Sequence, residues 1–317
     1  MNIFTIDGGT TNTRIAWVSD GVVKKQIKIP CGAGSTAETG SNEKLCHALK
    51  NGIQEMSSYC EVSDIVVSGM CNSELGIYEV PHITAPADIK TLANSVKSVY
   101  LPKVSSHLFH LIPGIKCDMD SLEKADLMRG EETEFFGICK SESIFGPVLA
   151  VLPGTHTKLV RSDNDGCIVS CITAISGEMI KALSENTILK KSLELPFAKH
   201  FDSDALKQGY RFAKNFGLSR ALFKVRIMQT QMHSEAIETN SFFTGAVLAD
   251  DIEMIVKESK GARIIIGGSE PLNKMMAELI LLETGIYSHI AEKEYAETAS
   301  ATGAYEIFKE IKKDSGK

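Results

Sequence analysis

The sequence lacks the features that mark several large classes of protein. It has no excess of positive charge: 34 lysines and arginines stand against 40 aspartates and glutamates, which gives a formal net charge of −6. A general binder of nucleic acid or of acidic membranes needs a strong positive field, so we expect neither partner. No apolar run approaches the roughly 20 residues that a membrane-spanning helix needs.

Close cysteine pairs are also missing. The eight cysteines are scattered, without the spacing that binds zinc or forms a thioredoxin-like redox site, and we expect most of them to be buried thiols. The opening run reaches an acid at Asp7, too early for a signal peptide. Together these observations predict a reducing, cytoplasmic location.

Two common nucleotide-binding motifs are absent as well. No G-x-x-x-x-G-K-[ST] occurs, and no G-x-G-x-x-G follows a strand at the first βα turn. What the sequence does have is size: its 317 residues, 43% of them hydrophobic and 23% charged, suffice for two domains with sizeable cores. Disorder as the dominant state is excluded.

The first half reads as a mixed sheet. Strands are predicted at 2–7, 14–19 and 22–29, and Asp20-Gly21 between the last two is a strong hairpin signal. Helical spacing over 43–56 and a short apolar run at 64–69 extend this sheet by an α/β crossover.

The second half repeats this opening. After Phe145-Gly146-Pro147 we predict strands at 148–152, 158–162 and 167–173, and later a strand at 263–266. Helices are predicted at 177–189, 204–216, 219–228, 241–259, 271–283 and 299–311. We therefore predict an N-terminal domain of residues 1–143 plus 296–317 and a C-terminal domain of residues 144–295.

Two glycine-threonine hairpins, about half a chain apart, are the most informative feature. Each has an apolar strand, a Gly-Thr turn, hydroxyls, a cation and another strand. Such a tip offers unobstructed N–H groups and short hydroxyl donors, which suit a phosphate approached closely. The predicted phosphate-binding residues are Gly9, Thr10, Thr11, Asn12, Arg14, Gly154, Thr155 and His156. For each hairpin alone, an ordinary tight turn is the alternative.

Two further positions fit a nucleotide. Asp7 ends a buried strand at the first tip, where a carboxylate binds Mg²⁺ through water or caps the turn. Gly267, Gly268 and Ser269 close a β-branched strand and open a helix, so a purine or a phosphate can lie against the backbone. We predict an adenosine site there.

This order of hairpins and glycine turns resembles the superfamily of actin-like ATPases and sugar kinases. Within it, the sequence is similar to the 2-dehydro-3-deoxygalactonokinase family, from Ile6 to the final helix. Four runs carry the likeness: Met128-Arg129-Gly130-Glu131-Glu132-Thr133, Leu152-Pro153-Gly154-Thr155-His156-Thr157-Lys158, Ser176-Gly177-Glu178 and Phe243-Thr244-Gly245. One position departs from the family, because Gly8 stands where tryptophan is common.

The resemblance implies an α/β fold of two ribonuclease-H-like (actin-like ATPase) domains, with mixed sheets around a central nucleotide cleft. It also implies transfer of the ATP γ-phosphoryl group, with Mg²⁺, to the 6-hydroxyl of 2-dehydro-3-deoxy-D-galactonate in galactonate catabolism. The expected partners are ATP and the sugar acid. A homodimer is an alternative to a monomer that the sequence does not decide.

The catalytic base is expected at Glu131 or Glu132, because the second hairpin has Pro153 where many relatives carry an acid. Hexokinase-like relatives have Asn-Asp-Thr at a similar junction, which favours Glu132 beside Thr133. Capping of the helix by these glutamates is the alternative.

Arg129, Lys158 and Glu178 are the predicted substrate-binding residues. Arg129 suits the keto-acid carboxylate, since a guanidinium holds a carboxylate by two parallel hydrogen bonds; a salt bridge to Asp126 or Glu132 is its alternative. Lys158 suits a phosphate or a carboxylate. Glu178 either orders the cleft or caps its helix, and His156 either donates at the tip or is a plain turn residue.

Two functions of the same fold compete with a kinase. In an exopolyphosphatase-like phosphohydrolase, water replaces the sugar hydroxyl, and a nucleotide-sensing module binds ATP without turnover. His107 and His110 lie three residues apart between Pro102 and Pro113, and we interpret them as a loop pair, not as metal ligands.

Overall fold

The computed structural model describes residues 1–315, which form two compact units. Unit 1 comprises Met1–Gly146, Ser162–Cys171 and the chain from Glu292 onward; unit 2 comprises Pro147–Arg161 and Ile172–Ala291. This division differs from the predicted domains by a few residues at each boundary and by residues 162–171. That segment packs with unit 1, where Ile168 forms an antiparallel bridge with Ala87.

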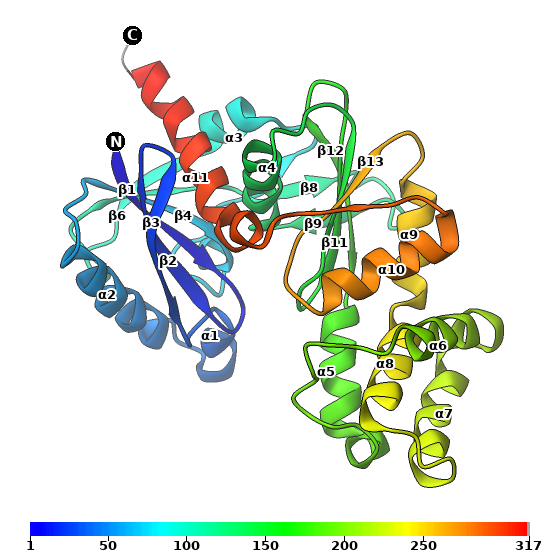
Figure 1. Cartoon of the computed structure of the whole chain (residues 1–317). Coiled ribbons are helices and arrows are strands. Elements are labelled where there is room, and N and C mark those ends of the chain that lie inside the picture. Colours follow the sequence, from blue (N-terminus) through cyan, green and yellow to red (C-terminus); the bar gives the residue numbers. More distant parts are fainter. Residues whose placement is uncertain (316–317) are drawn as a thin grey trace. The chain divides into compact units, whose positions relative to one another are not determined.

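Unit 1 contains a six-stranded sheet in the order β3-β2-β1-β4-β7-β6 (Figure 1). β1 pairs antiparallel with β2 and parallel with β4, so the predicted hairpin and its α/β crossover are confirmed. The strands are β1 (Asn2–Gly8), β2 (Thr13–Ser19), β3 (Val22–Ile29), β4 (Asp64–Gly69), β6 (Lys97–Tyr100) and β7 (Leu108–Leu111).

The core of unit 1 lies between this sheet and helix α2 (Glu43–Ser57). Leu45, Leu49, Ile53 and Met56 recur at helical spacing and are all buried, as the periodicity predicts. All six residues of β4 are buried, because both of its faces are covered. This burial fixes the carboxyl ends of β1 and β4 side by side.

Unit 2 repeats the arrangement in a five-stranded sheet, in the order β12-β11-β10-β13-β14. β10 pairs antiparallel with β11 and parallel with β13, as β1 does with β2 and β4. Its strands are β10 (Val148–Leu152), β11 (Thr157–Ser162), β12 (Ile168–Ala174), β13 (Arg263–Ile266) and β14 (His289–Ile290). The internal repeat inferred from the sequence is therefore structural.

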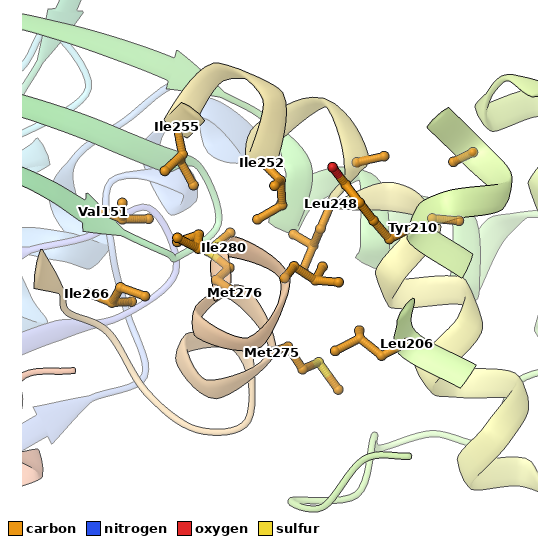
Figure 2. Packing of buried hydrophobic residues seen from close by; sticks show 14 of the residues in the cluster. Val151, Leu206, Tyr210, Leu248, Ile252, Ile255, Ile266, Met275, Met276 and Ile280 are labelled. Carbon is orange, nitrogen blue, oxygen red and sulfur yellow. The ribbon is translucent and has the colours of Figure 1, made fainter. Parts of the chain in front are cut away.

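Helices of unit 2 bury its sheet and one another. Val151 and Ile266 of the sheet meet Ile252, Ile255 and other apolar side chains of these helices in a single cluster (Figure 2). The helices are α5 (Ser176–Asn186), α6 (Ser203–Phe216), α7 (Leu218–Thr230), α8 (Ala236–Val247), α9 (Ala249–Glu258) and α10 (Leu272–Thr284).

The prediction of one helix in unit 2 was wrong. The sequence suggests a single helix over 241–259, but the structure breaks it at Leu248 into α8 and α9. Asp250 and Asp251 lie in the first turn of α9, where carboxylates favour the start of a new helix. Asp251 is thereby placed at a helix start instead of mid-helix.

The run Phe243-Thr244-Gly245 belongs to a close helix crossing. A Cβ added at Gly245 would lie 2.0 Å from the carbonyl oxygen of Leu206 on α6, and one added at Gly209 would lie 2.0 Å from that of Phe242. Only glycine allows α6 and α8 to approach so closely. This motif therefore supports the fold of unit 2.

Unit 1 has a matching crossing between α4 (Glu131–Ser141) and α11 (Lys293–Ser315). A Cβ at Gly137 would lie 1.9 Å from the carbonyl oxygen of Ala299, and one at Gly303 would lie 1.9 Å from that of Thr133. α11 also packs on α3 (Ile89–Ser95) and against β1 and β4. The closing helix thus fixes the start of α4 relative to the sheet.

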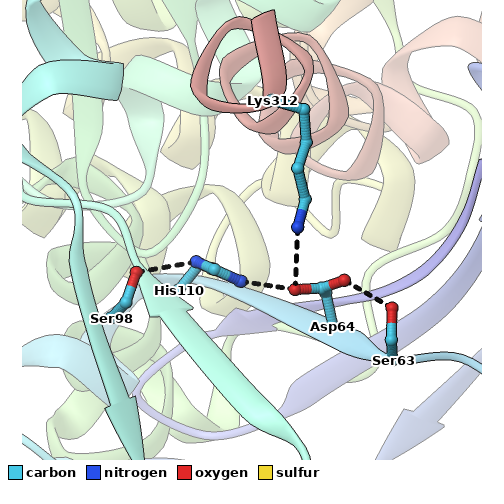
Figure 3. A network of polar contacts seen from close by, with 5 residues as sticks. All are labelled: Ser63, Asp64, Ser98, His110 and Lys312. Carbon is cyan, nitrogen blue, oxygen red and sulfur yellow. Dashed lines mark hydrogen bonds and ion pairs between the residues drawn. The ribbon is translucent and has the colours of Figure 1, made fainter. Parts of the chain in front are cut away.

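A polar network fastens the far end of α11. His110 donates from Nε2 to Oδ1 of Asp64 at 2.7 Å and accepts from Ser98 at 2.9 Å, while Lys312 reaches the same Asp64 oxygen at 3.3 Å (Figure 3). His110 is buried in β7, so its interpretation as half of a loop pair was wrong. Burial lowers the pKa of His110, and its bond to Asp64 offsets this only in part.

The chain between 80 and 128 holds elements that the sequence analysis did not predict. They are short, and most contain too few residues to show a period. Besides α3, β6 and β7 they are β5 (Ile83–Thr84), β8 (Ile115–Cys117) and β9 (Asp126–Met128), which form a three-stranded sheet in the order β5-β8-β9. α1 (Gly34–Thr39) and β14 were missed for the same reason.

Two other expectations about composition can be compared with the structure. Five of the eight cysteines are buried and three are partly exposed, which agrees with the expectation that most are buried. No helix within residues 1–315 has the length and apolar content that crossing a membrane would require.

We predict that Gly303→Ala destabilises the protein by about 1–3 kcal/mol, because the added methyl group forces α11 away from Thr133. Lys309→Ala on the exposed side of the same helix should change the free energy of unfolding by no more than about 0.5 kcal/mol. Urea unfolding followed by circular dichroism measures both. Equal stability of the two variants would contradict the proposed role of this crossing.

Candidate active site

The tip of the first hairpin, between β1 and β2, has several of its carbonyl groups occupied and three of its N–H groups available. Gly9 O accepts from Ala33 N–H at 3.1 Å, and Thr10 O accepts from Gly34 N–H at 2.8 Å. Among residues 1–315, the N–H groups of Thr10, Thr11 and Asn12 donate to no protein acceptor. Three adjacent donors are thus left for a ligand, which is the arrangement that binds an anion.

The tip of the second hairpin, between β10 and β11, is built in the same way. Thr155 O accepts from Glu178 N–H at 2.8 Å, and a Cβ at Gly177 would lie 2.0 Å from Gly154 O. The N–H groups of Gly154, Thr155 and His156 have no acceptor in the described part of the chain. In both units, the segment that opens the following helix holds the tip carbonyls.

Asp7 lies at the end of β1, and its side chain is 21% exposed. Its Oδ2 accepts from Arg14 Nη1 at 3.1 Å. Its Oδ1 faces Gly69 and Gly130, where added Cβ atoms would lie 3.2 and 3.9 Å away. Burial raises the pKa of Asp7, and the neighbouring Arg14 lowers it without cancelling that effect.

The residues that face Asp7 Oδ1 carry no side chain. Gly69 and Gly130 both have positive φ, at 75° and 113°, a conformation that favours glycine. No group of three or more metal-ligating side chains exists within residues 1–315. Mg²⁺ usually takes one or two carboxylates and completes its shell with water and phosphate.

Gly8 shows how this chain accommodates its departure from the resembled family. A Cβ at Gly8 would lie 2.4 Å from the sulfur of Cys71 and 2.7 Å from its backbone nitrogen. Cys71 therefore fills the space that a larger residue at position 8 would need. The thiol is fully buried beside Asp7, and this burial raises its pKa to about 12, so it stays neutral.

Glu131 and Glu132 both turn back onto the residues before them. Glu131 accepts from Arg129 N–H at 3.0 Å, and both oxygens of Glu132 accept from Gly130 N–H, at 2.9 and 2.8 Å. Both glutamates thus bind backbone N–H groups that precede α4, and no side chain caps its first turn; the base role stays a prediction. Burial, with the charge of Glu131, raises the pKa of Glu132 to about 8.

A pKa near 8 suits a general base, because such a group is most effective when its pKa lies near the working pH. Glu132 is fully buried, and the N–H of Gly130 and the charge of Arg129 compensate the desolvation only in part. Glu131 is partly exposed. The environment therefore distinguishes the two glutamates, which the sequence could not.

Arg129 is held by partners that the sequence did not suggest. Its Nη2 donates to Val80 O at 2.8 Å and lies 3.1 Å from His82 Nδ1. Within residues 1–315 it forms no ion pair with Asp126 or Glu132, and its buried Nη1 has no hydrogen-bond partner. Burial lowers the pKa of Arg129. A buried guanidinium N–H group without a partner can donate a hydrogen bond to an anionic ligand.

The remaining predicted residues lie around the second hairpin. His156 Nε2 lies 3.2 Å from Oε2 of Glu178, and Glu178 is exposed. Lys158 is buried in β11 and donates to the hydroxyl of Thr173 at 2.6 Å. Its ammonium group is thus directed to β12.

Gly267, Gly268 and Ser269 follow β13 and lie beside the base of this hairpin. Gly268 has a φ of 71°, and a Cβ there would lie 2.7 Å from Pro153 O. Gly267 N–H donates to Val151 O at 2.9 Å. The glycine turn and the second tip thus adjoin each other within unit 2.

Sequence reasoning missed several residues that shape these sites. Gly69 closes β4, the parallel neighbour of β1, and ligands commonly bind at the carboxyl ends of such strands. That rule could have drawn attention to it. Gly32 and Gly34 adjoin the first tip, and Asp251 binds Ser176 near the second hairpin. None of these three residues belongs to a sequence motif that could have identified it.

Three comparisons with known proteins bear on this chain. The model of the family "2-keto-3-deoxy-galactonokinase" matches residues 7–307. A protein of Rhizobium meliloti strain 1021, assigned as 2-dehydro-3-deoxygalactonokinase DgoK1, is 26% identical over 251 residues, 78% of each chain. The 2-dehydro-3-deoxygalactonokinase of Escherichia coli K12 is 25% identical over 252 residues, again 78% of each chain.

Solved structures agree on the fold. A crystal structure from Sinorhizobium meliloti, assigned as a 2-dehydro-3-deoxygalactonokinase, has a TM-score of 0.76 at 22% identity and covers 96% of this chain and 95% of its own. The ADPNP-bound activator of 2-hydroxyisocaproyl-CoA dehydratase from Clostridium difficile has a TM-score of 0.53 at 12% identity, covering 100% and 98%. The predicted α/β fold of two actin-like ATPase domains is confirmed. The family match over nearly the whole length means that this chain belongs to the 2-keto-3-deoxy-galactonokinase family of carbohydrate kinases, which use ATP.

Proposed function

We propose that this kinase transfers the γ-phosphoryl group of Mg·ATP to the 6-hydroxyl of 2-dehydro-3-deoxy-D-galactonate in galactonate catabolism. The family match supports the substrate. The observation that carries the chemistry is the pair of hairpin tips, each with three backbone N–H groups that no acceptor in the described chain uses. Phosphoryl transfer needs mainly such positioning and charge stabilisation.

The two tips and Asp7 act on the phosphates in this proposal. The N–H groups of residues 10–12 and 154–156 donate to phosphate oxygens, and Arg14 adds positive charge near Asp7. Asp7 is the carboxylate that would hold Mg²⁺, whose role when bound is to neutralise charge on the phosphates. Gly267 and Gly268 provide the flat backbone surface proposed for the adenosine.

Glu132 is the proposed general base. The 6-hydroxyl oxygen forms a bond to the γ-phosphorus, the bond from this phosphorus to the bridging oxygen of ADP breaks, and the hydroxyl proton passes to the Glu132 carboxylate. Its raised pKa supports this role, because the group can gain and lose a proton near neutral pH. Arg129 Nη1, buried and without a partner, is proposed to bind the substrate carboxylate.

Turnover should depend on Asp7. Asp7→Asn is expected to lower kcat by about 10²–10³-fold, the loss typical of removing one charge-stabilising group, with little change in folding stability. Asp20→Asn is the matched control. Asp20 is an exposed aspartate that directly follows β2, at the end of the β1–β2 hairpin opposite its tip. Release of ADP is followed with ATP, Mg²⁺ and 2-dehydro-3-deoxy-D-galactonate.

A panel of acceptors makes this experiment decisive. The galacto and gluco epimers of the keto-acid are compared with a reaction that contains no sugar acid. No ADP above background with either epimer would remove the proposed function, and phosphate release without any acceptor would favour a phosphohydrolase. Near-normal turnover of Asp7→Asn would reject its role in holding metal.

The two glutamates should differ in their effect on turnover and on its pH dependence. Glu132→Gln is expected to lower kcat by about 10²–10⁴-fold, and Glu131→Gln to lower it far less. In the wild type, kcat should rise with pH as Glu132 loses its proton, with a midpoint near 8.

Stability provides an independent measurement of the same group. The folded-state pKa of Glu132 is raised from 4.5 to about 8, so the folded chain binds this proton more tightly than the unfolded chain does. Its contribution is complete below pH 4.5 and is lost as pH rises through 8. Urea unfolding should therefore show a fall in stability over this range that Glu132→Gln lacks; parallel pH profiles would contradict the assignment.

A further inference from the structure

Asp251 is a buried carboxylate that none of the roles above uses. It lies in the first turn of α9 and is 2% exposed. The next residue, Ile252, and Ile255 pack in the core of unit 2 (Figure 2). α9 is therefore held firmly, and the position of the Asp251 side chain is set by that packing.

One oxygen of Asp251 fixes the start of α5. Ser176 Oγ donates to Asp251 Oδ1 at 2.5 Å, and Ser176 is the first residue of that helix. The next two residues, Gly177 and Glu178, are those that contact the carbonyl groups of Gly154 and Thr155. A chain of direct contacts thus links Asp251 to the second hairpin tip.

Among residues 1–315, the other oxygen of Asp251 has no hydrogen-bond partner. Asp251 Oδ2 and Thr157 Oγ1 are both buried and have no hydrogen-bond partner. The Thr157 hydroxyl nevertheless lowers the pKa of Asp251, so it lies near enough to act on the carboxylate. Thr157 opens β11 directly after the tip. One hydrogen bond between these two groups would satisfy both.

The far end of β11 is tied to the same helix. Arg161 donates from Nη1 to Glu258 O and from Nη2 to Lys260 O, the second at 3.0 Å. β11 is thus fastened to α9 at its end, and Asp251 lies where the strand begins. No lysine or arginine pairs with Asp251 within residues 1–315, and burial raises the pKa of this carboxyl. The hydrogen bond from Ser176 is the contact that holds this carboxylate.

We infer that Asp251 is a positioning residue for the second phosphate-binding hairpin. Through Ser176 it sets the start of α5, which holds the tip carbonyls, and through Thr157 it sets the start of β11. The N–H groups of residues 154–156 are thereby aimed at the nucleotide phosphates. This inference rests on the proposed function, in which those groups bind ATP.

The test compares Asp251→Ala with Asp250→Ala, the exposed neighbour on the same helix. Binding of ADP is measured by calorimetry, and KM is measured for ATP and for the sugar acid. Asp251→Ala should weaken ADP binding and raise KM for ATP by about tenfold or more, and leave KM for the sugar acid within about twofold of the wild type. Asp250→Ala should change neither.

Conservative and partner variants separate positioning from general destabilisation. Asp251→Asn should restore most of the ATP affinity, because its amide still accepts from Ser176 and can donate to Thr157. Ser176→Ala and Thr157→Val should each weaken ATP binding. Both variants should fold even if Asp251→Ala fails to fold. Ser176→Ala should add little to the effect of Asp251→Ala, since both act through one contact.

Two results would overturn the inference. If the wild type binds ADP but Ser176→Ala, Thr157→Val and every folded Asp251 variant bind it equally well, Asp251 does not position the hairpin. The same holds if KM rises equally for both substrates. If the wild type binds neither ADP nor ATP, the proposed function fails first, and the inference fails with it.

Discussion

The close contact between α4 and α11 is the constraint on which the candidate site residues of unit 1 depend. Each helix presents a glycine to the other's backbone, Gly137 to Ala299 and Gly303 to Thr133, with no room for a methyl group. α11 is fixed in turn by its packing on β1 and β4 and by Lys312 at Asp64. Because α4 cannot slide along α11, its first residues stay where Gly130 adjoins Gly69 and Oδ1 of Asp7. Residues nearly 300 positions apart in the chain thus set one local geometry.

The two hairpin tips show how neighbouring segments can engage carbonyl groups of a turn and leave its N–H groups available. A turn ordinarily exposes carbonyl oxygens beside its N–H groups, and these oxygens would repel a phosphate. Here the carbonyls of Gly9 and Thr10 are engaged by residues 33 and 34, and that of Thr155 by Glu178. The contacting segments carry glycines, Gly32 and Gly34 in one unit and Gly177 in the other, because a side chain would clash with the tip. The repeated sequence pattern therefore preserves an arrangement of partners as well as a turn.

Sequence reasoning succeeded where the signal is local and failed where it depends on distant contacts. The strands around both hairpins, α2 and β13 follow from period and turn residues, and the structure has them. The elements between 83 and 128 are mostly two to four residues long, too short for periodicity, although Asp88 capping Thr91 N–H at 2.7 Å was a usable start signal for α3. In the candidate site, Asp7 and the two hairpin tips each lie within one short sequence motif, so the sequence alone could identify them. The partners of Arg129 at Val80 and His82, and the complete burial of Glu132, arise from segments far apart in sequence.

Asp7, which is partly buried, and Glu132, which is fully buried, have neighbours of opposite charge. Burial raises the pKa of both, so desolvation alone would make them alike. Asp7 has Arg14 beside it, which favours the charged form, and two glycines face its Oδ1. Glu132 has Glu131 beside it, and its nearest arginine is directed to Val80 and His82, so it holds a proton more readily. Carboxylates whose surroundings differ in this way commonly divide into an ion that stays charged and a group that exchanges protons. Within unit 1 the two carboxylates therefore differ in the sign of the charge beside them, which is positive at Asp7 and negative at Glu132.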